Sequence, residues 1–439
     1  MGAISPARQA AFGILVSVER GQSHSDDLLR RKNVEALSDA DRNLATALVM
    51  GVLRWQIQLD RRIRPLLKHP NAKLDTEVLI ALRMGAFQLL HLDRIPARAA
   101  IDESVELAKS AGHRFASGMV NAVLRKLSRE RNEESASSEA YPAWMVERWV
   151  DTYGVAATGT ISEHGQHQPS VTVRIEDLAV EEELEAAGIK LEPGELLTNT
   201  RTVAVGDVTK TDAFCEGRVR LQDEGSQLVA ELAGRGRAIL DCCAAPGGKT
   251  LILAERNPTA RIVACESNAQ RLTQLRERLN EFGDRLEFRL VDVTLLADVS
   301  AYDVVLADVP CSGTGTLGRN PEIRHRLRPE DFARQAERQH AILRAALRAV
   351  RPGGQVIYST CSLEPEENQE IVTAVLSESH DLRLISLQSR IEELRDEGIL
   401  THSGADRLRG CVMPDGSLSL LPGDFHTDGF FVARIEKEA

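Results

Sequence analysis

Strand-like and helix-like segments alternate from about residue 225 to the end of this 439-residue chain. Short apolar runs are followed by longer segments with apolar residues at helical spacing, such as 269–282 and 331–350. The strand candidates are Ala238–Cys242, Arg261–Glu266, Arg285–Val291, Tyr302–Asp308 and Gln355–Thr360. This order predicts a parallel sheet with helices on both faces. Ser417–Leu421 and Gly429–Ile435 predict a closing antiparallel pair.

The part before residue 225 has a different character. Apolar residues recur at helical spacing in 42–55, 74–90, 100–109 and 116–127, which predicts a helical bundle over 1–130. The polar stretch 129–140 is typical of a flexible linker. A helix from Ala143, strand candidates at 170–175, 203–205 and 219–221, and a helix at 180–187 predict a small α+β module. The expected domains are therefore 1–130, 141–224 and 225–439.

Composition narrows the class of protein. A chain of this length is too long for one ordinary core, and it has no apolar run long enough for a membrane span and no signal-peptide layout. Seven cysteines without disulfide-like spacing indicate a reducing compartment, so we expect a cytoplasmic protein. The net charge of −11 is uneven, because residues 1–130 carry 20 Lys+Arg against 14 Asp+Glu. A nucleic-acid partner is therefore not excluded.

Two cysteines directly follow neighbouring strand candidates. Cys311 lies in Asp308–Gly313 and Cys361 in Ser359–Ser362, each just past an apolar run. The carboxyl ends of parallel strands share one crevice, which is where ligands bind. Two thiols there, beside Asp308, indicate covalent chemistry on an electron-poor ring. A thiolate that adds to carbon 6 of cytosine makes carbon 5 nucleophilic, once the base has left its stack.

The roles of these side chains have ordinary alternatives. Cys361 suits the nucleophile, because a helix start at Glu364–Glu367 lowers a thiol pKa, although the glutamates act in the opposite direction. Asp308 can hold the cytosine edge, or it can simply cap a turn. A single cysteine is usually a small buried hydrophobe, and that is the expectation for Cys215, Cys265 and Cys411. No Cys-x-x-Cys or paired His spacing predicts a metal site.

A glycine-rich turn, Asp241–Thr250, follows the first strand of the last domain and opens a helix. Glycines let the backbone approach a ligand, and a helix amino end favours negative charge. The turn matches neither the dinucleotide fingerprint nor the phosphate loop. Glu266 and Asp292 end the next two strands, where carboxylates can accept from the ribose hydroxyls and the adenine amino group of an adenosine. Isolated surface acids are the alternative.

Basic residues also gather directly after the Cys311 loop. Arg319, Arg324, His325, Arg326 and Arg328 can grip RNA phosphates or form a solvated face. Residues 30–32 and 61–64 of the bundle are weaker candidates of the same kind.

Residues 225–437 resemble the RNA cytosine-5 methyltransferases of the Nol1/Nop2/Sun group. The resemblance rests on the turn Cys243–Thr250, on Asp308–Gly313, on Thr360–Ser362 and on Asp428–Phe431. Segments 40–54, 83–90 and 118–125 resemble the RNA-binding NusB-like fold. A NusB-like bundle fused to such a domain is similar to the bacterial small-subunit rRNA methyltransferases.

The resemblance implies a multidomain chain with an all-α NusB-like bundle, a small α+β module and an α/β Rossmann-like methyltransferase domain. It implies S-adenosylmethionine as cofactor, Cys361 as nucleophile, and Cys311 assisting proton removal or product release. The implied cofactor contacts are Cys243, Ala244, Ala245, Pro246, Gly247, Gly248, Lys249, Glu266, Asp292 and Asp308. Glu266 departs mildly from the family, in which Asp is common at this position.

The expected activity is therefore carbon-5 methylation of a cytosine in 16S rRNA, by resemblance the cytosine at position 967. The expected partner is protein-free or early-assembly 16S rRNA, with a monomeric enzyme and neither membrane nor metal. The same chemistry on tRNA is one alternative, and a non-catalytic RNA-binding assembly factor is another. A dehydrogenase is a third.

Overall fold

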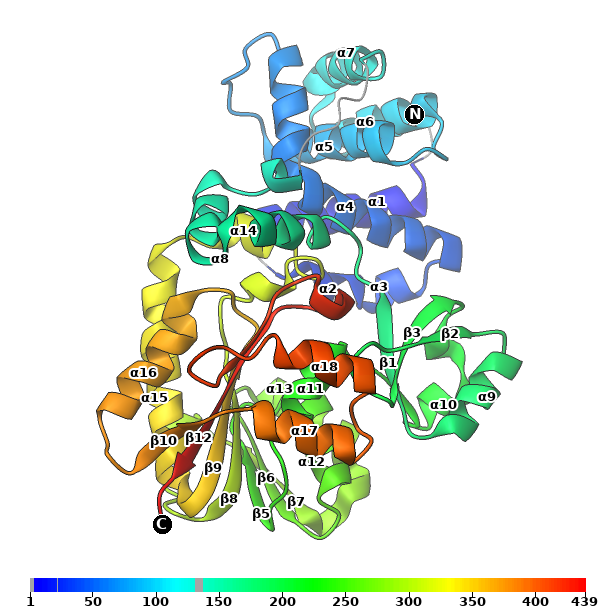
Figure 1. Cartoon of the computed structure of the whole chain (residues 1–439). Helices are drawn as coiled ribbons and strands as arrows, with labels where there is room; N and C mark the ends of the chain where they lie inside the picture. The colour runs from blue at the N-terminus through cyan, green and yellow to red at the C-terminus, as the bar shows by residue number, and fades with distance from the viewer. Residues whose placement is uncertain (1–3, 22, 131–136) are drawn as a thin grey trace. The chain divides into compact units, whose positions relative to one another are not determined.

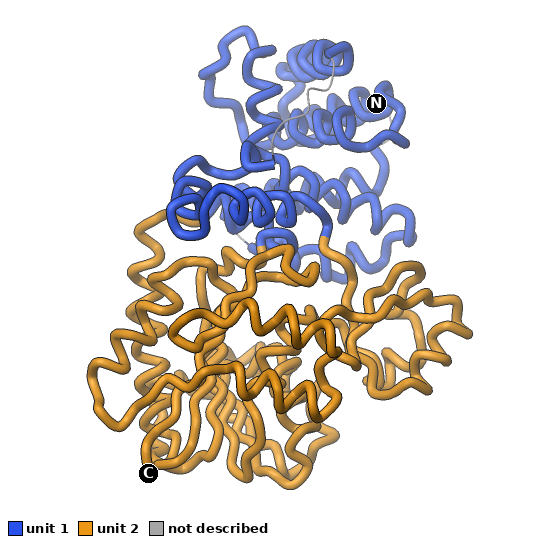
Figure 2. The backbone as a smooth tube through the Cα atoms, in the orientation of Figure 1, with its two compact units in different colours: residues 1–168, 317–326 blue, residues 169–316, 327–439 orange. Residues whose placement is uncertain are grey.

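The chain divides into two compact units. A computed structural model describes residues 4–21, 23–130 and 137–439. Unit 1 contains the chain up to Gln168 together with Leu317–Arg326, and unit 2 contains Pro169–Thr316 and Leu327–Ala439 (Figure 2). The short segment Leu317–Arg326 of unit 1 therefore interrupts the sequence of unit 2. No helix within the described residues is long and apolar enough to cross a membrane.

Unit 1 is helical (Figure 1). Its helices are α1 (Pro6–Glu19), α2 (Ser25–Leu29), α3 (Lys32–Glu35), α4 (Asp39–Ile63), α5 (Thr76–His91), α6 (Ala97–Ser110), α7 (Ser117–Leu127), α8 (Ala143–His164) and α14 (Ile323–Arg326), with short 3-10 turns η1 (Arg64–Leu66), η2 (Arg114–Ala116) and η3 (Ser137–Ala140). The four segments predicted from apolar spacing correspond to α4 to α7 and are confirmed.

The core of unit 1 lies between α1, α4, α5, α6 and α7. Apolar residues at helical spacing give each helix one buried face. Gly51 permits close packing of α4 against α5, because a β-carbon there would lie 1.9 Å from the Phe87 ring. Ser38 caps α4 by accepting a hydrogen bond from the amide of Asp41.

The segment after the bundle differs from the expected domain division. Helix α8 was expected in the α+β module over 141–224, but it belongs to unit 1. Tyr141 and Trp149 are buried and pack edge to face, with ring centroids 5.5 Å apart. These aromatic contacts lie within unit 1, which extends to Gln168. Residues 131–136 of the predicted linker lie outside the described residues.

The small module forms the first part of unit 2 and has its own core. Its four-stranded antiparallel sheet has the order β2-β3-β1-β4. The elements are β1 (Val171–Ile175), α9 (Leu178–Ala186), β2 (Lys190–Pro193), β3 (Thr200–Val205), the turn η4 (Val208–Lys210), α10 (Asp212–Cys215) and β4 (Val219–Leu221). The three predicted strands are confirmed, and β2 was missed because its exposed, charged residues lack an alternating pattern.

The large sheet of unit 2 has the order β10-β12-β9-β8-β5-β6-β7, and β11 pairs with β12. Strands β7, β6, β5, β8 and β9 run parallel, whereas β12 pairs antiparallel with β9, β10 and β11. The strands are β5 (Ala238–Asp241), β6 (Arg261–Glu266), β7 (Leu286–Leu290), β8 (Tyr302–Asp308), β9 (Val350–Thr360), β10 (Leu382–Ile385), β11 (Leu418–Leu420) and β12 (Phe430–Lys437). The predicted parallel sheet and closing pair are confirmed.

Helices cover both faces of this sheet (Figure 1). They are α11 (Glu224–Leu232), α12 (Gly248–Arg256), α13 (Ala269–Leu279), α15 (Glu330–Ala349), α16 (Gln369–Ser377), α17 (Gln388–Asp396) and α18 (His402–Arg409), with 3-10 turns η5 (Asn280–Arg285), η6 (Val293–Leu295), η7 (Thr314–Thr316), η8 (Pro365–Glu367) and η9 (Asp424–His426).

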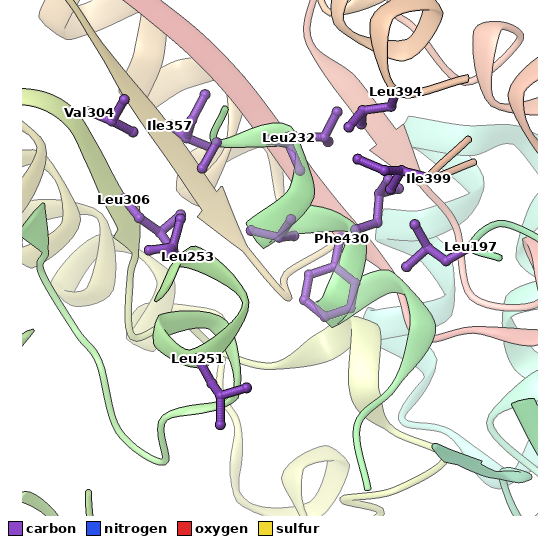
Figure 3. Close-up of a cluster of buried hydrophobic side chains, with 14 of the residues drawn as sticks. Leu197, Leu232, Leu251, Leu253, Val304, Leu306, Ile357, Leu394, Ile399 and Phe430 are labelled. Carbon is purple, nitrogen blue, oxygen red and sulfur yellow. The ribbon is translucent and has the colours of Figure 1, made fainter. Parts of the chain in front are cut away.

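Strand residues alternate between two cores. Val304 and Leu306 of β8 join the core formed with α11, α12, α13 and α17, where Leu251 and Leu253 of α12 also lie (Figure 3). Val305 belongs to the opposite core, formed with α15 and α16. Side chains alternate across a strand, so a strand buried on both faces is a continuous apolar run. This burial fixes the register, and with it the positions of the loops that follow β5, β6, β8 and β9.

Candidate active site

The glycine-rich turn connects the end of β5 to α12. Gly247 is the residue before the helix and has φ +105°, a left-handed conformation that disfavours other residues. A β-carbon there would lie 2.7 Å from Cδ1 of Leu275 on α13. The turn therefore needs glycine at this position both for its backbone angle and for its packing against α13.

Asp241 stabilises the glycine-rich turn through hydrogen bonds. Its side chain is fully buried, and it accepts hydrogen bonds from Thr250 Oγ1 at 2.7 Å and from the Cys243 amide at 3.4 Å. Burial raises the pKa of Asp241 to about 6. The carboxylate therefore links Cys243, at the start of the turn, to Thr250, in the first turn of α12.

Two neighbouring pockets collect most of the predicted site residues. The larger has a volume of about 290 Å³ and contains seven of them among its lining residues, namely Cys243, Ala245, Glu266, Asp292, Asp308, Cys311 and Cys361. The smaller has a volume of about 100 Å³ and adds Ala244, Pro246, Gly248 and Lys249. Gly247 lines neither pocket.

The two acids that end β6 and β7 line the larger pocket. Glu266 is buried, its Oε1 accepts from the Asn268 amide at 2.8 Å, and its Oε2 lies 3.5 Å from Nη1 of Arg271. Asp292 is exposed, and its Oδ1 accepts from the amide of Thr294 at 3.0 Å. Each carboxylate thus has one oxygen held by backbone, which fixes its orientation beside the pocket.

Lys249 and Asp308 connect the turn to the end of β8. Lys249 Nζ lies 2.8 Å from Asp308 Oδ2, and Ser359 Oγ donates to Asp308 Oδ1 at 2.6 Å. The ammonium group also lies 5.5 Å from the centre of the Phe430 ring. Burial lowers the pKa of Lys249, but the charge of Asp308, the hydrogen bond that Lys249 donates to it and the neighbouring Cys361 outweigh this effect and raise the pKa overall. Lys249 therefore places a positive charge close to Asp308 and Cys361.

The two predicted cysteines are neighbours. Asp308 of β8 pairs in register with Ser359 of β9, so the two following loops begin at the same level of the sheet. Cys311 Sγ lies 3.2 Å from Cys361 Sγ. The hydrogen bond with Cys361 and burial raise the pKa of the Cys311 thiol well above its usual range. Cys311 therefore keeps its proton at neutral pH and can donate it toward Cys361.

The local structure after Cys361 differs from the sequence-based expectation. No α-helix starts at Glu364; a 3-10 turn (η8) covers Pro365–Glu367, and α16 begins only at Gln369. Contrary to the sequence-based prediction, Cys361 therefore does not lie directly before the amino end of an α-helix. Glu364 and Glu367 are buried instead of solvated.

Sequence reasoning missed several pocket residues. Arg271 of α13 and Arg338 of α15 line the larger pocket, and Gln222 lines the smaller one. They lie on helices and connecting segments rather than at strand ends. No motif signal marks them, because only the helix phase brings these side chains to the pocket.

The basic residues after the Cys311 loop do not form a single exposed patch. Arg324 is only 1% exposed and lies in unit 1, where its guanidinium donates to the carbonyls of Gly165 at 3.1 Å and Leu317 at 3.2 Å. It stacks on the Tyr141 ring at 4.0 Å. His325 Nε2 lies 2.7 Å from the Leu53 carbonyl oxygen. The RNA-gripping hypothesis is wrong for Arg324, whose role is to hold Leu317–Arg326 in unit 1.

The remaining cysteines fit the packing expectation unevenly. Cys265 is buried between the sheet and its helices, as expected for a small hydrophobe, and Cys242 is buried there too. Cys411 is partly buried, and Cys215 is exposed, so the prediction for Cys215 was wrong. Cys215 ends the short helix α10 of the small module, where the chain turns at the surface.

Comparison with known protein families agrees with this geometry. Residues 232–436 match the model described as 16S rRNA methyltransferase RsmB/F, and residues 5–129 match the NusB family. The matched ranges correspond to the sheet domain, with most of the residues that line the two pockets, and to the helical bundle.

Similar proteins match this chain over nearly its whole length. A probable ribosomal RNA small subunit methyltransferase B of Bacillus subtilis is 32% identical, over 98% of both chains. The ribosomal RNA small subunit methyltransferase B of Xanthomonas campestris is 31% identical, over 98% of this chain and 97% of that one.

Solved structures share the fold. The crystal structure of PH0851 has a TM-score of 0.79 at 22% identity, and covers 99% of this chain and all of that chain. NSun6 from Pyrococcus horikoshii, solved with the S-adenosylmethionine analogue SFG, has a TM-score of 0.57 at 18% identity, over 69% of this chain and 100% of that one. The chain belongs to the ribosomal RNA small subunit methyltransferase B family and is an S-adenosylmethionine-dependent methyltransferase.

Proposed function

We propose that this protein methylates carbon 5 of a cytosine in 16S rRNA through a covalent cysteine adduct. The observation that carries the proposal is the pair of thiols, with sulfur atoms 3.2 Å apart, in the same pocket as Glu266 and Asp292. Methylation of a more nucleophilic atom, such as an exocyclic amine, has no need of a thiol. Two thiols beside a cofactor pocket therefore favour carbon 5 as the target.

The residues of the pocket fit an adenosine-containing cofactor. Glu266, whose Oε2 also lies 3.5 Å from Arg271 Nη1, can accept from the ribose hydroxyls, and Asp292 can accept from the adenine amino group. Cys243, Ala244, Ala245, Pro246 and Gly248 line the pockets at the amino end of α12. When bound, S-adenosylmethionine supplies an electrophilic methyl group.

Cys361 is the proposed nucleophile and Cys311 its helper. Lys249 places a positive charge near Cys361 and Asp308. The thiolate adds to carbon 6 and makes carbon 5 electron-rich. After methylation, a base takes the carbon-5 proton, the electron pair of that bond restores the carbon 5–carbon 6 double bond, and the Cys361 sulfur leaves carbon 6 with its bonding pair. Cys311 lies close enough to Cys361 to assist this release.

Asp308 is the proposed contact for the target base. Its carboxylate lines both pockets and is oriented by Lys249 and Ser359. A carboxylate accepts through more than one lone pair on each oxygen, so Asp308 can also accept from the cytosine amino group. The base must be flipped out of its stack to reach this depth.

The substrate class follows from the family and the bundle. The relatives are named as small-subunit rRNA methyltransferases, and the matching NusB-family region carries the net positive part of the chain. Protein-free or early-assembly 16S rRNA, and within it the cytosine at position 967, is the proposed target. A tRNA substrate is the rival with the same chemistry. A role as an assembly factor without catalysis is disfavoured because the pocket contains both thiols and both acids.

Release of tritium tests the target atom directly. Transfer to carbon 5 must displace the hydrogen there, so 16S rRNA transcribed with [5-³H]cytidine should release one tritium for each methyl group transferred. The same RNA with protein but without S-adenosylmethionine is the background control. Methyl transfer without tritium release would overturn carbon 5 as the target. Transfer to a labelled tRNA pool but not to 16S rRNA would favour the tRNA alternative.

A further inference from the structure

One buried carboxylate lies behind both cysteine loops. Glu367, in the turn η8, is 0% exposed and lines neither pocket. Its Oε1 accepts from the Ser312 amide at 2.9 Å and from Gln339 Nε2 at 2.9 Å. Its Oε2 accepts from the hydroxyl groups of Ser312 and Ser362. Four donors therefore converge on one carboxylate, which satisfies its buried charge through hydrogen bonds.

The donors come from the residues that follow the two cysteines. Ser312 is next in sequence to Cys311, and Ser362 is next to Cys361. The two hydroxyl oxygens lie 3.0 Å apart, and the two sulfur atoms lie 3.2 Å apart. Glu367 is thus the shared partner of two loops that the chain separates by fifty residues.

Further contacts hold Glu367 and the Cys361 loop in place. Tyr358 donates its hydroxyl to the Glu367 carbonyl at 2.6 Å, and Asn368 Nδ2 donates to the Ser362 carbonyl at 2.9 Å. Tyr358 is fully buried in the sheet. The carboxylate is therefore attached to the rigid end of β9 rather than to a free loop.

We infer that Glu367 is a positioning residue that sets the distance between the two thiols. The inference rests on the proposed function for its meaning in catalysis, but the thiol spacing can be measured without any RNA. In the proposed reaction Cys361 must attack the ring and later leave it with Cys311 within reach. A carboxylate that holds both loops keeps this geometry through both steps.

Disulfide formation by a diazenedicarboxamide oxidant reports the spacing. Each thiol gives up one hydrogen, one Sγ–Sγ bond forms, and the azo group of the reagent is reduced to a hydrazine. Peptide mapping without reduction identifies the Cys311–Cys361 bond and separates it from pairs that involve Cys242 or Cys243. Wild-type protein should form this bond rapidly, because its sulfur atoms are already neighbours.

The variant Glu367→Gln should form the bond at least about tenfold more slowly, the equivalent of one lost hydrogen bond to a charged group. The matched control is Glu370→Gln, which changes an exposed glutamate on α16 and should leave the rate unchanged. The double variant Ser312→Ala with Ser362→Ala keeps the carboxylate and removes both hydroxyl donors, so it should also slow the reaction. If circular dichroism shows that Glu367→Gln is unfolded, the disulfide rate of the double variant replaces it in the test.

Methyl transfer gives a second readout. Glu367→Gln should lower kcat and leave KM for S-adenosylmethionine unchanged, because Glu367 does not line the cofactor pocket. A folded Glu367→Gln variant that forms the disulfide at the wild-type rate would overturn the inference, as would a wild type that does not form it. Absence of methyl transfer in the wild type would count against the proposed function alone, since the disulfide rates would still decide the role of Glu367.

Discussion

Replacing Arg324 with methionine should destabilise unit 1 by about 3 kcal/mol. The side chain is 1% exposed, donates to the carbonyls of Gly165 and Leu317, and stacks on Tyr141. Of the four hydrogen bonds that Arg324 donates to backbone carbonyls, the two shorter ones and the carbonyls they leave unpaired account for about 3 kcal/mol. The desolvated cation–π contact accounts for about 2 kcal/mol. Methionine carries no charge, so the variant avoids part of the free-energy cost of burying the guanidinium. The same cost lowers the pKa of Arg324. We assign about 2 kcal/mol to that relief.

Tryptophan fluorescence makes the effect measurable in unit 1 alone. The three tryptophans of the chain, Trp55, Trp144 and Trp149, all lie in unit 1. In urea, with a slope of about 2 kcal/mol per molar, the fluorescence midpoint should fall by about 1.5 M. The matched control is Arg328→Met, which removes an exposed arginine of unit 2 and should not move the midpoint.

A small effect would refute the reasoning. If the urea midpoint for Arg324→Met stays within about 0.3 M of the wild-type midpoint, the guanidinium does not hold Leu317–Arg326 in unit 1. A fall of the same size in Arg328→Met would show that the loss of positive charge, rather than the buried contacts, is responsible.

Three further changes test the cofactor turn. Gly247→Ala should weaken S-adenosylmethionine binding measured by calorimetry, because φ +105° and the contact with Leu275 both exclude a β-carbon; unchanged affinity would contradict this account. The raised pKa of Asp241, about 6, means that its contribution to stability is present below pH 4 and is lost as pH rises through 6. Asp241→Asn should therefore gain up to about 3 kcal/mol relative to wild type between pH 4 and pH 7 in calorimetric unfolding, and a pH-independent difference would refute it. Lys249→Met should lower kcat by about tenfold or more, because Asp308 and Cys361 lose a neighbouring positive charge; a change below twofold in single-turnover methyl transfer would contradict this.

The sequence was sufficient to predict the secondary structure where apolar residues follow a regular pattern along the chain. Most of the parallel strands were predictable because they contain continuous apolar runs, and the predicted bounds of Tyr302–Asp308 and Arg261–Glu266 match those of β8 and β6. Once those strands are parallel, Cys311 and Cys361 must emerge at the same sheet edge, so their proximity was predictable too. The structure adds the distance between them.

The sequence was insufficient where one residue satisfies several distant partners. Arg324 stands in an arginine-rich run, and nothing local distinguishes it from its solvated neighbours, yet it is buried against carbonyls far away in the chain. Glu367 follows Glu364 and Glu366 in a run that looks like an acidic, solvated turn. Its four donors come from three separate segments, and local pattern cannot reveal such convergence.

The covalent adduct with RNA is the most direct test of the central claim. Cys311→Ala should release the methylated base slowly, so mixing it with S-adenosylmethionine and protein-free 16S rRNA should give an RNA–protein band that survives denaturing electrophoresis. Adding Cys361→Ser to the same variant should abolish the band. Methyl transfer by the wild type, with no band in Cys311→Ala or with a band that persists in the double variant, would contradict the assignment of Cys361 as nucleophile.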